Sequence, residues 1–162
     1  MPAISAYEGG SLAEAASVCL EANAHCSPVA LAVRGDYQRS ASLSFLEVTD
    51  QMRRTHGDAE VATERGACAI AILLACRLSE YTVVHRSYKG TGVDYFLGDR
   101  NDFLFQQKAR LEVSGIDKGS EADIRRRKKI KLEQTRRSDA LQIPAIVVII
   151  EFSRPVAEVV QR

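Results

Sequence analysis

The chain has 162 residues, which is enough for one domain with a hydrophobic core and short for two domains. Hydrophobic residues make up 46% of it and charged residues 27%, as is ordinary for a soluble globular protein. The net charge of +1 favours no class of partner, so any case for one depends on where the charges lie.

Nothing in the sequence indicates export or insertion into a membrane. Residues 1–10 lack the basic start and the apolar run of a secretory signal. The longest apolar run, residues 143–150, is too short to span a bilayer. The four cysteines have no tight metal-ligand spacing. We therefore expect a reduced, cytoplasmic protein without a membrane partner.

The first predicted elements are a helix and a β-hairpin. Residues 11–25 have a helical pattern, with Ser11 as the cap and Glu14 completing a capping box. Two strands are expected at residues 29–35 and 41–48, and the loop between them is long enough for a hairpin.

The later segments alternate between helical and extended patterns. Asp50 is expected to begin a short helix that Gly57 ends or bends. Apolar residues over 58–78 cover much of a helix circumference, so this helix should pack on more than one side. The remaining elements are expected as strands at 81–87, 93–98 and 108–115, a helix at 120–137 capped by Ser120, and a fully covered strand at 143–152.

These elements predict one α/β domain over residues 1–162, with a mixed sheet flanked by helices. From residue 58 their order is helix, strand, strand, strand, helix, strand. Residues 58–152 form the core. Residues 1–57 form an N-terminal extension of one helix and one hairpin, and this hairpin either adds to the sheet or caps one of its edges. Residues 153–162 are a C-terminal tail.

Two acidic residues on neighbouring strands are candidates for metal ligands. Asp94 lies in an apolar strand after a Gly-Thr-Gly turn, where a buried carboxylate needs a partner. Alternation puts Glu112 on the polar face of the next strand, and hairpin pairing would bring it near Asp94. Such a pair repels unless one acid is protonated or a cation lies between them, and it suits Mg²⁺ or Mn²⁺. Glu64, on the apolar helix, is expected to be partly buried and to supply a third ligand.

The element order and the two acids resemble the restriction-endonuclease-like nucleases, the PD-(D/E)xK superfamily, over about residues 58–152. In that family an Asp on the second core strand and the Asp/Glu-x-Lys of the third bind divalent metal and position the attacking water. Gly92-Val93-Asp94 stands where the family has its Asp, and Glu112-Val113-Ser114 where it has Asp/Glu-x-Lys. Glu64 matches a helix Glu of some branches.

The resemblance has two departures. Gln134 matches a helix Gln of the RecB-like branch, but the Tyr that follows it there is Ser138 here. The family's motif Lys is replaced by Ser114, which cannot stabilise negative charge in the transition state as a cation does. The candidates to supply that cation are Lys128 and Lys131 of the following helix and Arg110 on the strand of Glu112. A structural alternative needs no metal, since Arg110 or Arg86 could pair with the two acids.

The helix at 120–137 carries a run of positive charge. Its basic residues are Arg125, Arg126, Arg127, Lys128, Lys129 and Lys131. Phosphate contacts from Lys and Arg dominate nucleic-acid affinity, so this run, with Lys89 of the glycine turn and with Gln134, is the predicted nucleic-acid-binding surface. The alternative is that these cations are solvated or paired with nearby acids.

We therefore expect a metal-dependent nuclease that cleaves DNA, with RNA as the second choice, and uses Mg²⁺ or Mn²⁺ held by Asp94, Glu112 and Glu64. One alternative is a nuclease-like fold without catalysis that serves as a nucleic-acid-binding or assembly subunit, in a bacterial defence or mobile-element system. Another is binding of nucleic acid through the basic helix alone. An exposed edge in the upstream hairpin would favour a homodimer.

Overall fold

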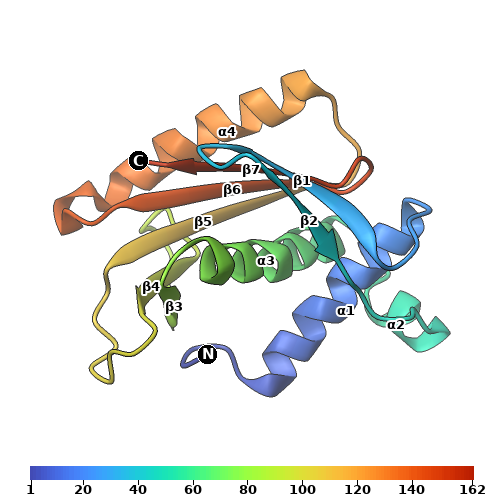
Figure 1. Cartoon of the computed structure of the whole chain (residues 1–162), viewed down its shortest axis with the longest axis horizontal. Coiled ribbons are helices and arrows are strands. Elements are labelled where there is room, and N and C mark those ends of the chain that lie inside the picture. The colour runs from blue at the N-terminus through green and yellow to red at the C-terminus, as the bar shows by residue number, and fades with distance from the viewer.

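The computed structural model describes residues 1–162 as helices packed around one sheet (Figure 1). The helices are α1 (Ala6–Ala22), α2 (Asp50–Thr55), α3 (Ala59–Leu78) and α4 (Glu121–Thr135), which a 3-10 segment, η1 (Arg136–Leu141), follows. The strands are β1 (Val29–Gly35), β2 (Arg39–Leu43), β3 (Tyr81–Arg86), β4 (Tyr95–Asp99), β5 (Ala109–Ile116), β6 (Ala145–Glu151) and β7 (Val156–Gln161). None of the helices combines the length and apolar composition needed to cross a bilayer.

The strands form a single sheet in the order β2-β1-β7-β6-β5-β4-β3. β1 pairs with β7 and β5 with β6 in parallel, and the other neighbours are antiparallel. α3 packs against the sheet with α1 beside it, and α4 crosses the opposite face (Figure 1). The predicted α/β class with a mixed sheet between helices is therefore confirmed.

The two central strands are covered on both faces. Every residue of β6 is buried, and so is every residue of β5 except the last. A continuous apolar run such as Ile146–Ile150 suits this position, because both faces of the strand are removed from water. β5 differs, since it carries the buried polar residues Arg110, Glu112 and Ser114 into the α4 side of the sheet.

The N-terminal helix begins earlier than its sequence pattern predicts. Ser5, not Ser11, is the cap of α1, and its hydroxyl accepts a hydrogen bond from the backbone of Glu8 at 3.1 Å. Ser11 lies inside the helix, so the expected capping box with Glu14 is wrong. The capping box at Ser120 is confirmed: its side chain and that of Asp123 satisfy each other's backbone amides at the start of α4.

The expected C-terminal tail is instead a strand in the interior of the sheet. β7 pairs with β6 on one side and with β1 on the other, so residues 156–161 connect the N-terminal hairpin to the core. The hairpin therefore extends the sheet, as one of the two expected arrangements had it. Its second strand, β2, ends at Leu43 and forms one edge of the sheet.

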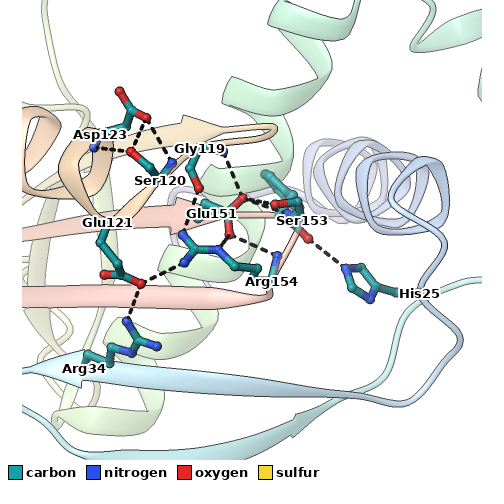
Figure 2. Close-up of polar contacts among 10 residues, drawn as sticks. His25, Arg34, Gly119, Ser120, Glu121, Asp123, Glu151, Ser153 and Arg154 are labelled. Carbon is teal, nitrogen blue, oxygen red and sulfur yellow. Dashed lines mark hydrogen bonds and ion pairs between the residues drawn. The ribbon is translucent and has the colours of Figure 1, made fainter.

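A buried carboxylate fixes the end of β6 near the start of α4 (Figure 2). Glu151 is fully buried and accepts hydrogen bonds from the backbone amides of Gly119, Ser153 and Arg154 and from the Ser153 hydroxyl. The Arg154 guanidinium then contacts Glu121, which also pairs with Arg34 (Figure 2). The β6–β7 turn, β1 and the first turn of α4 are thus held together by one polar network.

The α1–α3 crossing provides a test of the packing. A Cβ at Gly66 would lie 2.8 Å from the Cα of Ala16, whereas a Cβ at Gly10, on the exposed side of α1, would meet nothing within 4 Å. We expect Gly66→Ala to lower the free energy of unfolding by about 1–3 kcal/mol, because the helices must separate. Gly10→Ala should raise it by about 1 kcal/mol through helix propensity. Urea denaturation measures both, and equal stability of the two variants would contradict the close crossing.

Candidate functional site

The candidate site is a cleft where β4 separates from β5. β4 pairs with β5 only at Ala109, Arg110 and Leu111, so the edge of β5 is open from Glu112 onward. A cleft of about 200 Å³ lies at this open edge, between the α3 and α4 sides of the sheet. Its lining residues are Glu8, Leu12, Glu64, Arg65, Cys68, Arg86, Asp94, Tyr95, Val113, Ser114, Arg127 and Lys131.

Asp94 lies directly before β4 and is held against the open edge of β5. Its Oδ2 accepts a hydrogen bond from the backbone amide of Val113 at 2.8 Å, and its own amide donates to the carbonyl of Leu111 at 2.9 Å. Gly92, two residues earlier, has φ +74°, and a Cβ there would lie 2.1 Å from the carbonyl oxygen of Gln134. The glycine turn therefore packs against the end of α4, and this contact sets the position of Asp94.

Glu112 is the next acid of the site and is almost completely buried, with 1% of its surface exposed. Its Oε1 accepts hydrogen bonds from Nζ of Lys131 at 2.5 Å and from Nε2 of Gln134 at 2.8 Å. Its Oε2 is buried without a hydrogen-bond partner. α4 thus satisfies one oxygen of this carboxylate and leaves the other for a proton, a water or a cation.

Burial and the neighbouring acid raise the pKa of Glu112 from 4.5 to about 7. The larger cause is removal of the carboxylate from water, and the second is repulsion by the charge of Asp94. Lys131 opposes both effects through its hydrogen bond and its charge, but does not cancel them. The predicted proximity of Asp94 and Glu112 is therefore confirmed, and a further positive charge here would stabilise their ionised forms.

Two cations of α4 reach the site from one side of the helix. Arg127 donates from Nη1 to the hydroxyl of Ser114 at 3.1 Å, and Lys131, one turn later, contacts Glu112. Ser114, where the resemblance would expect a Lys, is thus approached by a guanidinium. Lys131 is one of the cations expected at the site, whereas the position of Arg127 in the basic run predicts only nucleic-acid binding.

Two of the expected cations lie elsewhere. Arg110 is 3% exposed and points toward η1, where it donates to the carbonyls of Thr135 and Ile143 and to the hydroxyl of Ser138. Lys128 points toward β7 and pairs with Glu158 at 2.6 Å. Neither lines the cleft, so the structure does not bring these two expected cations to the pair of acids: Arg110 supports the η1 turn, and Lys128 ties α4 to β7.

Glu64 lines the cleft but is exposed, so the expected partial burial is wrong. Cys68, one turn further along α3, lies deeper in the same wall. Burial, and then the charge of Asp94, raise the pKa of its thiol to about 12, so it is present as an uncharged thiol. No group of three or more His, Cys, Asp or Glu side chains is arranged to hold a metal ion, so Glu64 does not complete a three-acid site with Asp94 and Glu112.

The other predicted nucleic-acid contacts divide between separate surfaces. Arg125, Arg126 and Lys129 are exposed on the outer side of α4, and Lys89 is exposed on the glycine turn. Gln134 is not on that outer surface, because its side chain donates to Glu112. Arg65, Arg86 and Glu8 also line the cleft, although they come from three distant segments and no sequence pattern groups them.

No protein-family model, no curated protein and no solved structure matches the chain.

The raised pKa of Glu112 predicts a pH dependence of stability. Below pH 4.5 the acid is protonated in the folded and the unfolded chain, and between pH 4.5 and about 7 only the folded chain keeps the proton. Wild type should therefore lose stability relative to Glu112→Gln as the pH rises through this window, on the order of 3 kcal/mol when complete. Urea denaturation in EDTA from pH 4 to 8 measures the difference, and parallel curves for the two proteins would contradict it.

Proposed function

We propose that the protein is a metal-dependent nuclease with a restriction-endonuclease-like core, cleaving DNA in preference to RNA. The observation that carries the proposal is the unpartnered Oε2 of Glu112, buried beside Asp94 at the open edge of β5. Further support comes from the order α3-β3-β4-β5-α4-β6, which is the element order of the superfamily that the sequence resembles.

The donor set fits Mg²⁺ or Mn²⁺. These ions need few protein ligands, because waters and substrate phosphate oxygens complete their coordination, and the two carboxylates of Asp94 and Glu112 are of the preferred type. When bound, such an ion lowers the pKa of a coordinated water and neutralises charge on the scissile phosphate. Its charge also offsets the repulsion that raises the pKa of Glu112.

The chain's own residues supply orientation and positive charge. The backbone of Val113 holds one oxygen of Asp94, and Gln134 with Lys131 holds one oxygen of Glu112, so both acids are fixed before substrate binds. Arg127 and Lys131 place cations on the α4 side of the cleft, where they stabilise negative charge that develops on a phosphate. They would take the role of the Lys that Ser114 replaces.

A nuclease-like binding subunit without catalysis is the second candidate, and one observation favours it. Lys131 pairs with Glu112 at 2.5 Å, so a lysine of the chain already provides a countercharge for this acid. In that case the fold would present its basic surface to nucleic acid or a partner subunit, and the two acids would serve stability alone.

The first test is cleavage. We expect the purified protein with Mg²⁺ or Mn²⁺ to cut plasmid, linear duplex or single-stranded DNA, and Asp94→Asn or Glu112→Gln to lower the rate at least about 100-fold. The matched control is Glu133→Gln, the same chemical change at an exposed position of α4, which should leave the rate unchanged. Equal rates for Glu112→Gln and Glu133→Gln would contradict a catalytic role for Glu112.

The second test is metal binding without turnover. Mn²⁺ or Mg²⁺ should raise the melting temperature of wild type at pH 8, because it binds the folded chain alone, and should not raise that of Asp94→Asn or Glu112→Gln. Metal-independent melting together with nucleic-acid binding would favour the binding subunit. Charge reversal at Arg126 and Lys129 would then abolish that binding, and the carboxylate variants would bind as wild type does.

A further inference from the structure

Two arginines converge on a single carboxylate in the wall of the cleft opposite α4. Arg65 of α3 places Nη2 3.3 Å from Oε2 of Glu8 and 3.0 Å from the Ser11 hydroxyl. Arg86, at the end of β3, places Nη1 3.8 Å from the other oxygen of Glu8. Glu8, Arg65 and Arg86 all line the cleft that Asp94 and Lys131 line.

The positive charges of the cleft differ in how firmly they are held. Lys131 is bound to the buried Glu112, and Arg127 to the Ser114 hydroxyl. Arg65 and Arg86 have Glu8 as their only acidic partner, and the Arg86 side chain is 71% exposed. An ion pair as open to water as that of Arg86 and Glu8 contributes little to stability, so Arg86 is not needed to hold the fold, whereas Arg65 is 31% exposed.

The arrangement has the chemistry of a phosphate site with a carboxylate in it. Guanidinium groups bind carboxylate and phosphate oxygens with the same donor geometry, and a serine hydroxyl commonly adds a further donor. Glu8 lies in the first turn of α1, where the helix N-terminus favours a negative charge. Its carboxylate would therefore remain stabilised after leaving the arginines.

We propose that Arg65, Arg86 and Ser11 form a binding subsite for a backbone phosphate of a nucleic-acid strand, and that Glu8 occupies this subsite in the free protein. The strand would place one phosphate on the side of Arg127 and Lys131 and another against the two arginines, displacing Glu8. Glu8 thereby weakens binding of every strand and makes occupation of the cleft depend on a phosphate able to compete for both guanidinium groups. The inference rests on the proposed function for the identity of the ligand as nucleic acid.

The test is the affinity of a fluorescein-labelled single-stranded DNA oligonucleotide and of its duplex, measured by anisotropy in EDTA. Glu8→Gln should bind at least one of the two about threefold to tenfold more tightly than wild type, since the internal competitor loses its charge. The matched control is Glu14→Gln, which makes the same change on the same helix but at a residue that faces His56 outside the cleft. It should bind within about twofold of wild type, because distant surface charge is screened.

Arginine variants make the assignment specific. Arg65→Gln and Arg86→Gln should each weaken binding and reduce the dependence of log Kd on log salt concentration by about one unit. In the Arg65→Gln/Arg86→Gln background, Glu8→Gln should have no further effect. Equal affinities of Glu8→Gln and Glu14→Gln, an effect of Glu8→Gln that persists without the arginines, or no binding by any variant would each overturn the subsite.

The test of the phosphate subsite can be told apart from the test of the nuclease, because binding is measured without metal and cleavage is measured with metal. Tighter binding by Glu8→Gln in a protein that never cleaves would leave the subsite standing and refute the nuclease. Metal-dependent cleavage by a protein in which Glu8→Gln and Glu14→Gln bind nucleic acid equally well would support the nuclease and refute the subsite.

Discussion

A nearly inaccessible carboxylate, that of Glu112, determines how the two layers of the site fit together. An acid in the middle of a buried strand has lost its hydration and must be compensated by groups of the protein. The compensation comes from Lys131 and Gln134. The position of α4 over the sheet and its rotation about its own axis must therefore bring both side chains to one oxygen of Glu112. Arg127 lies one turn before Lys131, and the same rotation places it over Ser114.

The same constraint extends to the glycine turn and to the start of α4. Gly92 packs against the backbone of Gln134, so the turn that carries Asp94 is located by the residue that binds Glu112. At the other end of α4, the network of Glu151, Arg154 and Glu121 fixes the first turn to the β6–β7 connection. A helix held at both ends in this way presents its inner cations to the cleft with little freedom.

Much of this could be predicted from local sequence patterns. The apolar run of β6, the apolar residues over much of α3 and the closeness of the two acids depend on neighbours in sequence, and the structure has all three, although Asp94 lies directly before β4 and not in it. Which cation faces the acids could not be predicted, because consecutive basic residues leave the rotation of α4 undefined. Its rotation is set by the buried oxygen of Glu112, a tertiary contact. The grouping of Glu8, Arg65 and Arg86 could not be predicted either, because the packing of α1 and β3 against α3 brings together residues from distant parts of the chain.

The position of β7 has a consequence for how the chain reaches its fold during synthesis. β7 follows the other six strands of this sheet in the sequence, yet it lies between β1 and β6. The N-terminal hairpin therefore has no partner strand until residues 156–161 have left the ribosome, and its β1 edge stays unpaired meanwhile. Pairings between residues so far apart in sequence form slowly, because a long loop must close first. Until then the hairpin presents a free strand edge to other nascent chains.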